Sequence, residues 1–248
     1  MNPGRSTVSA FLTAEWRHLV MFNYAMDPSL LQPFVPRGTE LDTWNGPTYA
    51  SIVGFRFLDS RLFGIPIPFD QDFAEVNLRF YVRRESGSEL RRAVVFIREI
   101  VPRRAVAVLA RRLYNEPYSA LPMRCAVESG PHPAVQYAWQ LKGKWYTLAA
   151  RSGRPFALPV DGSFEQFIAE HYWGYTRQTD GSTIEYRVAH PPWAVAPAAS
   201  YHIDADLAAV YGPHLAAALQ TPVSVFLADG SPITVSRPVR LDKTMGRI

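Results

Sequence analysis

Cysteine, lysine and long apolar runs are scarce in this chain of 248 residues, and each scarcity excludes a class of protein. The single cysteine, Cys125, excludes an intramolecular disulfide and a zinc site built from several thiolates. No apolar run approaches the roughly 18 residues of a membrane-spanning helix. The first residues, MNPGRSTVSAFLTAEW, lack the apolar stretch of a signal peptide. We therefore expect a cytoplasmic protein that does not bind membranes.

Among the 26 basic residues, the lysines are Lys142, Lys144 and Lys243, and the rest are arginines. Arginine is permanently cationic and suits the binding of carboxylate or phosphate, whereas catalysis through an amine requires lysine. The arginines are interleaved with acids and the formal net charge is only +4, so we expect no nucleic-acid partner.

Motifs for several common chemistries are missing as well. The histidines show neither H-x-x-x-H nor H-x-H spacing, so we expect no metal site. The chain contains no P-loop, no G-x-G-x-x-G and no G-x-S-x-G, which argues against nucleotide binding and serine hydrolysis. We expect no cofactor.

What the sequence does contain is alternation typical of β-strands. Residues 76–84, VNLRFYVRR, alternate between apolar and polar side chains. Residues 93–101, AVVFIREIV, are apolar on both faces, with Arg98 interrupting one face and Glu99 the other. Strict alternation would group Val94 and Phe96 with Ile100. A strand buried on both faces indicates a barrel wall or a sheet backed by a helix.

The remaining elements follow from periodicity, caps and turn residues. We expect one domain over residues 1–248, with about 12 N-terminal and 10 C-terminal residues loosely held. A short helix should start at Pro28 with Asp27 as its cap, and Ser163 should cap another helix. Helices are expected at 102–114, 163–173 and 207–219, strands at 17–26, 41–44, 49–58, 119–128, 135–141, 145–150 and 183–189, and a final hairpin of 222–227 and 233–236 joined at Asp229-Gly230.

Charges inside the apolar strand at 93–101 must be paired or lie on a cavity. In one interpretation Arg98 pairs with an acid such as Glu116, and Glu99 pairs with an arginine such as Arg79, as supports of the wall. In the other interpretation these charges belong to a pocket. The sequence leaves both open.

Arg103 and Arg104 follow Pro102, in the first turn of an expected helix, where cations oppose the helix dipole unless an anion binds there. The alternative is a solvated basic patch. His190, at the end of a strand, either acts as a general base or simply hydrogen-bonds a loop. We take Arg79, Arg98, Arg103, Arg104, Glu116 and Tyr118 as candidate ligand-binding residues, and Glu99 and His190 as candidate catalytic residues.

Three stretches carry a resemblance to a known family: residues 15–59, residues 76–118 with the core FIREIVPRR, and residues 164–193 with FEQFIAEHYWGYT and YRVAHPPW. They resemble the YqjF-like family, a bacterial family of unknown function in the acetoacetate-decarboxylase-like superfamily. The resemblance implies an α+β fold, in which a large, mostly antiparallel β-sheet with a few helices curls into a barrel-like cone around a small-molecule cavity.

The resemblance also bears on chemistry. Acetoacetate decarboxylases of that superfamily carry a Pro-Lys-Lys-like segment, and its first lysine forms a Schiff base. The matching positions here are Pro102, Arg103 and Arg104, one residue closer to the preceding Arg-Glu pair. Arginine neither forms an imine nor loses its proton at ordinary pH. The resemblance therefore implies that Schiff-base decarboxylation is lost.

Three functions remain. The leading hypothesis is a protein that binds a small organic acid or another anionic ligand. The alternative is a lyase, hydratase or isomerase without a Schiff base, in which Glu99 or His190 acts as acid or base and an arginine stabilises an enolate. The third is a structural or interaction module that forms a homo-oligomer through the apolar loop at residues 62–69.

Overall fold

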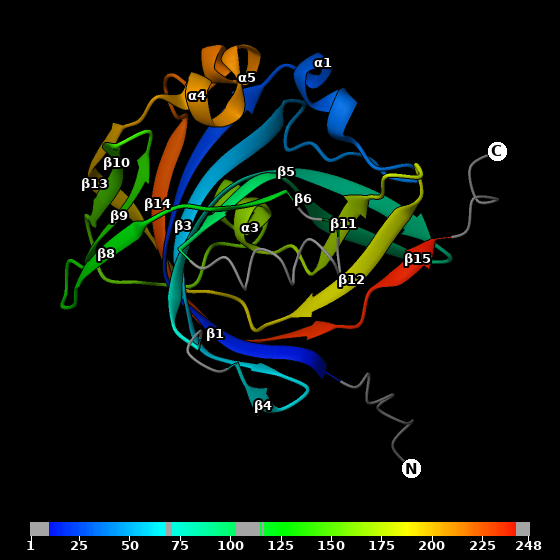
Figure 1. Cartoon of the computed structure of the whole chain (residues 1–248), viewed down its shortest axis with the longest axis horizontal. Helices are drawn as coiled ribbons and strands as arrows, with labels where there is room; N and C mark the ends of the chain where they lie inside the picture. The colour runs from blue at the N-terminus through cyan, green and yellow to red at the C-terminus, as the bar shows by residue number, and fades with distance from the viewer. Residues whose placement is uncertain (1–9, 68–70, 103–114, 116, 242–248) are drawn as a thin grey trace.

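The strands form one large, mainly antiparallel sheet that curls on itself, and a few short helices pack against it (Figure 1). The computed structural model describes residues 10–67, 71–102, 115 and 117–241. This architecture confirms the expected curled sheet. The elements are β1 (Ala10–Met26), α1 (Pro28–Leu31), η1 (Gln32–Phe34), β2 (Glu40–Leu41), β3 (Thr48–Leu62), β4 (Ile65–Pro66), β5 (Phe73–Ser86), β6 (Glu89–Val101), β7 (Tyr118–Ala120), β8 (Met123–Glu128), β9 (Ala134–Leu141), β10 (Lys144–Ser152), α3 (Phe164–Ala169), β11 (Trp173–Arg177), β12 (Thr183–Ala189), β13 (Val195–Asp204), α4 (Leu207–Tyr211), α5 (Pro213–Ala218), β14 (Ser224–Ser236) and β15 (Val239–Leu241).

Seven strands close into a ring. They follow the order β12-β11-β6-β5-β3-β1-β14, and β12 also pairs with β14. In that closing contact Val188 lies opposite Val235, and Ala189 lies opposite Thr234. β6 runs parallel to its ring neighbour β11, and also to β7, which pairs with β6 but is not part of the ring order. All other neighbouring strands in the ring are antiparallel.

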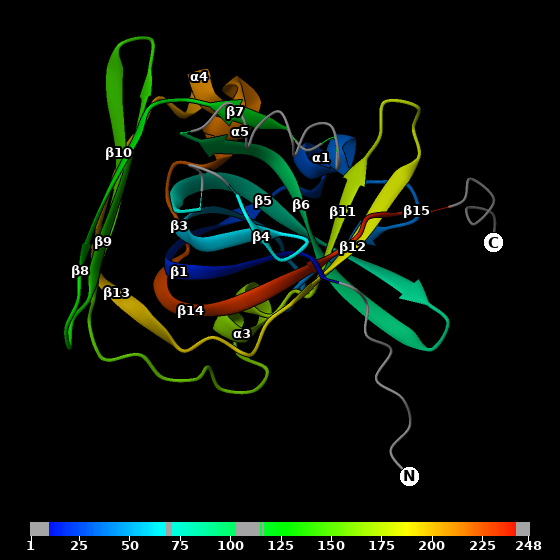
Figure 2. The same ribbon diagram turned by 60° about the horizontal axis from the view of Figure 1, so that its bottom comes forward.

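A second part of the sheet folds over the outside of the ring. Beyond β14 the order continues through β13, β10, β9 and β8, and Figure 2 shows these strands as an arm beside β1 and β3. Tyr137 of β9 fixes the arm to the ring, because its hydroxyl donates to the His18 carbonyl at 2.7 Å. Its ring packs on Gly54 so closely that no side chain fits there.

The ring wall therefore has a hydrophobic core on each face. On β5, Val76, Leu78 and Phe80 belong to the outer core together with the arm and helices α4 and α5. Phe73 and Tyr81 of the same strand belong to the inner core, which also holds Phe167 and Ile168 of α3. The interpretation of the two-sided apolar strand as a barrel wall is confirmed.

One bulge in β6 overturns the face assignment made by strict alternation. Leu78 pairs with Arg98 and the next residue, Arg79, pairs with Phe96, so Ile97 is an extra residue without a partner. A bulge of this kind reverses the alternation beyond it. Val94 and Phe96 consequently share the inner face with Glu99, while Ile100 lies in the outer core.

The expected final hairpin is also wrong. β14 runs without interruption from Ser224 to Ser236, and Gly230 lies inside it opposite Arg17 of β1. Gly230 has φ of 84°, and a Cβ at this position would lie 2.0 Å from the Trp16 carbonyl oxygen. The glycine therefore permits a close approach of two strands rather than a chain reversal.

Two of the expected helices are shorter in the structure than the sequence predicts. α3 begins as predicted, with Ser163 Oγ accepting from the Gln166 amide at 3.2 Å, but it ends at Ala169 because Trp173 already pairs in β11. The helix expected at 207–219 is divided at Gly212, which has φ of 86°. The helix expected at 102–114 lies almost entirely outside the described residues. In the described ranges, no helix has the length and apolarity to span a membrane.

Replacing Gly54 by alanine should lower the free energy of unfolding. The new Cβ would lie 2.6 Å from Tyr137 Cδ2 and 3.2 Å from Leu148 Cδ1. Forcing an extra methyl group into a packed core costs about 1–3 kcal/mol, and urea denaturation measures this loss. Gly153→Ala is the control, because Gly153 is exposed and its nearest neighbour would be at 3.3 Å. An equal effect in both variants would contradict close packing of the arm.

Candidate functional site

A cavity of about 200 Å³ lies inside the ring. Most of its wall is apolar or aromatic, and its polar groups come from a few positions on neighbouring strands. Its aromatic residues are Phe11, Trp16, Phe55, Phe57, Phe73, Phe96, Tyr118, Tyr186 and Trp193, and its other polar residues are Ser60, Glu75, Asn77, Arg79, Glu99, His171 and His190. An apolar cavity with a few polar groups is the usual form of a small-molecule site.

Three polar side chains of β5 form a line along one wall of the cavity. Glu75, Asn77 and Arg79 share the inner face because side chains of a strand alternate, and neighbours in this line are about 7 Å apart. All three are buried. Asn77 Nδ2 donates to Glu75 Oε1 at 2.9 Å, which orients that carboxyl group.

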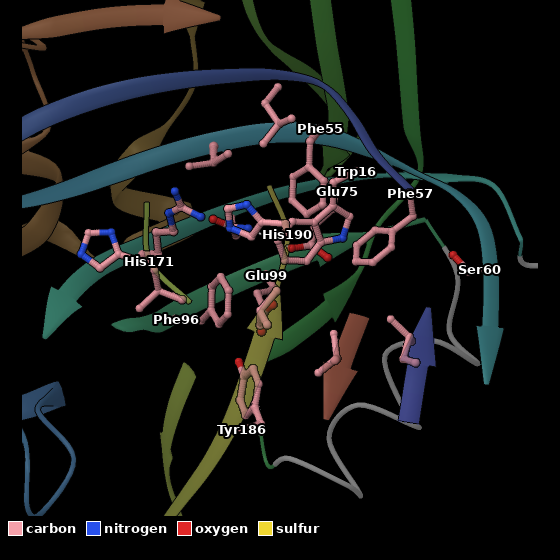
Figure 3. Close-up of a pocket in the computed structure, with 18 of the residues that line it drawn as sticks. Trp16, Phe55, Phe57, Ser60, Glu75, Phe96, Glu99, His171, Tyr186 and His190 are labelled. Carbon is pink, nitrogen blue, oxygen red and sulfur yellow. Dashed lines mark hydrogen bonds between the residues drawn. The ribbon is translucent and has the colours of Figure 1, made fainter. Parts of the chain in front are cut away.

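Glu99 joins this line from β6 because the bulge turns it inward. Its backbone partners are Asn77 on one side and Tyr118 on the other. The Tyr118 hydroxyl donates to Glu75 Oε2 at 3.3 Å. Two buried carboxyl groups and a phenol thus share one region of the cavity, and Figure 3 shows Glu75 and Glu99 near its centre.

Arg79 is a buried cation at the end of α3. Its Nη2 donates to the Ile168 carbonyl at 3.3 Å and lies 4.0 Å from the Met21 sulfur. Its guanidinium also lies over the Tyr81 ring, 5.7 Å from the centroid. Its Nε is fully buried and finds no acceptor among the described residues.

His190 is held as a neutral ring against the cavity. Nδ1 is 2.8 Å from the Pro191 carbonyl, and the ring stacks on Trp193 with centroids 4.3 Å apart. Burial lowers the pKa of His190 below its ordinary value, although the Pro191 carbonyl opposes this change. At neutral pH His190 is therefore uncharged, with Nδ1–H as the donor to Pro191.

Behind one end of the cavity, His171 belongs to a buried cluster with Asp42 and Arg92. His171 Nε2 is 3.8 Å from Asp42 Oδ2, and Arg92 Nε donates to the same oxygen at 2.7 Å. Burial lowers the pKa of His171 to about 4, against the attraction of Asp42. Burial alone would raise the pKa of Asp42, but His171 and Arg92 hold it at about 2.

The structure brings four of the predicted site residues together. Arg79, Glu99, Tyr118 and His190 all line the cavity. Arg98 is exposed and does not line it. The other three candidates, Arg103, Arg104 and Glu116, lie outside the described residues.

Sequence reasoning missed several polar residues of the cavity. Glu75 and Asn77 were detectable in principle, because they precede Arg79 by four and two residues and so share its face. Ser60 and His171 carried no such signal. Ser60 lies in β3 just after Asp59, whose φ of 48° interrupts the regular alternation, and His171 lies between α3 and β11.

The described part of the chain offers no group of three histidine, cysteine, aspartate or glutamate side chains that could hold a metal. Of the lysines, Lys142 and Lys144 are exposed near the hairpin between β9 and β10, and neither lines the cavity. Lys243 lies outside the described residues.

The pKa of His171 predicts that the protein loses stability as the pH falls. The folded protein binds this proton less readily than the unfolded chain, so the stabilisation is complete above pH 6.5 and is lost as the pH falls towards 4. The loss is about 3 kcal/mol. Urea denaturation at several pH values should show this slope, and His171→Phe should flatten it. His202→Phe, which replaces an exposed histidine, is the control and should keep the slope. A slope that persists in His171→Phe would assign it to another group.

Comparison with known proteins gives both a family and a fold. The model of the DUF2071 family, described as an uncharacterized conserved protein, matches residues 13–232. The uncharacterized protein YqjF of Bacillus subtilis (strain 168) is 27% identical over 183 residues, which is 72% of each chain.

Several solved structures are similar to this chain over nearly their whole length. Acetoacetate decarboxylase from Legionella pneumophila matches with a TM-score of 0.65 and 15% identity, covering 98% of this chain and 92% of that one. The enduracididine biosynthesis enzyme MppR, complexed with pyruvate, matches with a TM-score of 0.63 and 13% identity, covering 96% and 94%. At these identities the likeness concerns the fold, and it confirms the barrel that the sequence resemblance implied.

Proposed function

The chain belongs to the DUF2071 family, and from this premise we propose that it binds a small organic acid in the cavity of the ring. Arg79 carries the proposal. A buried charge is stable when it is paired and hydrogen-bonded. The guanidinium has five N–H donors in a planar fork that fits a carboxylate. The described residues offer it one carbonyl oxygen and one sulfur, so a carboxylate would satisfy donors that the protein leaves open.

A purely structural role for Arg79 is the alternative. Cations near the end of a helix interact favourably with its last carbonyl groups, and Arg79 contacts Ile168 in this way. The Ile168 carbonyl, however, accepts from only one nitrogen of the guanidinium, Nη2. The role at the helix end and the binding of a carboxylate are therefore compatible, since they occupy different N–H groups.

The similar structures support an organic acid as the ligand. One of them is named a decarboxylase of acetoacetate, and another is complexed with pyruvate. Neither described lysine lines the cavity, so the proposal includes no Schiff base. Arg103 and Arg104 remain sequence-based predictions for further contacts with the ligand.

Arg79→Met should weaken the binding of small carboxylic acids at least about tenfold, because it removes a hydrogen-bonded charge while keeping the apolar stem. Isothermal titration calorimetry with 2-oxo acids, short fatty acids and aromatic acids measures the affinity. The variant without ligand should unfold at the same temperature as the wild type or higher, because a buried cation is removed.

Arg83→Met is the matched control for this measurement. Arg83 belongs to the same strand and the same alternation as Arg79, but it is partly exposed and paired with Glu40 at 2.7 Å. It should bind the acids like the wild type. Equal affinity of the wild type and Arg79→Met for every acid would refute the proposed role of Arg79.

A second candidate function is an enzyme that moves a proton on the bound acid. It is favoured by the position of Glu99, which is buried in the cavity wall between Asn77 and Tyr118. Glu99 would then act as the acid or base of a lyase, hydratase or isomerase, with His190 as the other candidate base.

Exchange of ligand C–H protons in D₂O, followed by NMR, tests this second function. The wild type should catalyse exchange next to the carboxylate of an acid that binds. Glu99→Gln should abolish the exchange while the acid still binds, because the amide cannot accept the proton. His190→Phe tests in the same way whether the imidazole of His190 accepts the proton. If the wild type binds the acid but catalyses no exchange, this second function is refuted and only the binding function remains.

A further inference from the structure

The cavity has polar side chains at two ends, and between them aromatic rings lie beside the carboxyl groups of Glu75 and Glu99. Figure 3 shows His171 at one end and Ser60 at the other, with Trp16, Phe55 and Phe57 in between. Arg79 belongs to the His171 end, because it bonds the carbonyl of Ile168, three residues before His171. A ligand that fills the cavity would therefore present its carboxylate at one end and its body to the aromatic rings.

The aromatic middle favours a flat ring as that body. Trp16 packs edge-on against Phe55 at 5.3 Å, against Phe57 at 5.7 Å and against Trp193 at 6.2 Å, measured between centroids. Aromatic pairs in such arrangements are more stable than their buried area alone would give. An aromatic ligand would add further ring–ring contacts of this kind, whereas an aliphatic ligand would gain only from the burial of its apolar surface area.

The volume suits a ligand with one ring. An apolar cavity of about 150 Å³ accommodates benzene. This cavity, of about 200 Å³, leaves additional space for a carboxylate on a short linker.

Two buried polar atoms of the residues that line the cavity lack a hydrogen-bond partner among the described residues. They are the hydroxyl oxygen of Ser60, a residue with no exposed surface, and Nε1 of Trp16. The backbone groups of Ser60 are occupied, since its amide donates to Gln71 and its carbonyl accepts from Ile67, both at 3.1 Å. The indole N–H is a donor and the serine hydroxyl is both donor and acceptor, so a ligand hydroxyl can bond to either of them.

We infer that the ligand is a hydroxyaryl carboxylic acid. Its carboxylate contacts Arg79, its ring lies among the aromatic side chains, and its hydroxyl bonds to the Ser60 hydroxyl or to the Trp16 indole N–H. This inference rests on the proposed function and names the class of acid that the same cavity takes.

The test is calorimetric titration of the full-length protein with four probes. These are 4-hydroxyphenylacetate, phenylacetate, cyclohexylacetate and the neutral 2-(4-hydroxyphenyl)ethanol. The hydroxylated acid should bind about tenfold more tightly than phenylacetate, the size expected for one satisfied hydrogen bond. Phenylacetate should bind more tightly than cyclohexylacetate, and the neutral alcohol should bind more weakly than 4-hydroxyphenylacetate.

Ser60→Ala and Trp16→Phe examine the hydroxyl end. Each removes one candidate partner of the ligand hydroxyl, so at least one of the two variants should bring the two phenyl acids closer in affinity. Trp16→Phe keeps an aromatic ring, so it preserves the test if Ser60→Ala does not fold. Ser200→Ala, at an exposed position of β13, is the control and should retain the preference.

The outcomes separate this inference from the proposed function. If carboxylic acids bind but cyclohexylacetate matches phenylacetate, the inference is overturned and the proposed function stands. The same holds if the hydroxyl preference is absent or survives in both variants. If no acid binds, or if the neutral alcohol binds as tightly as 4-hydroxyphenylacetate, the proposed function fails and the inference fails with it.

Discussion

The closing contact between β12 and β14 is the interaction on which the cavity depends. Without it the sheet would be a curled surface with two edges, and the inner faces of β5 and β6 would be open to water. Closure encloses an inner core to which every ring strand except β11 contributes, and the arm of β8 to β10 helps to form another core on the outer side of part of the wall. A wall of this kind must be apolar on both faces, so polar residues within it require a specific explanation.

The bulge at Ile97 supplies that explanation for Glu99. Before the bulge, β6 presents Val94 and Phe96 to the cavity, and beyond it the alternation reverses. The reversal places Glu99 inside and leaves Arg98 exposed. Bulges often re-aim a side chain beside a functional site. A single extra residue has thus moved a carboxyl group into a region of low dielectric, where its charge interacts strongly with any ligand or neighbouring group.

Helix α3 connects the two charged regions of the inner core. The carbonyl of Ile168 near its last turn accepts from Arg79, and two residues past its end His171 packs against Tyr81 and faces Asp42. Arg79, which the proposed function assigns to the ligand, and His171, to which we assign the loss of stability in acid, therefore both lie beside the same short helix. A displacement of α3 would change the cavity and the Asp42 cluster together.

The sequence by itself determined most of the strands, the two-sided wall, the caps at Asp27 and Ser163, and four of the residues that line the cavity. These features depend on side-chain alternation and on short-range hydrogen bonds, which are local in the chain. Only the tertiary structure decided that β12 meets β14, that Ile97 is a bulge, and that Gly230 lies within a strand. Each of these depends on the register between strands that are far apart in the sequence, and a shift of one residue in register exchanges the inner and outer faces. For the same reason the sequence could not show whether Arg98 or Glu99 faces the cavity, and only the register in the folded sheet places Glu99 there.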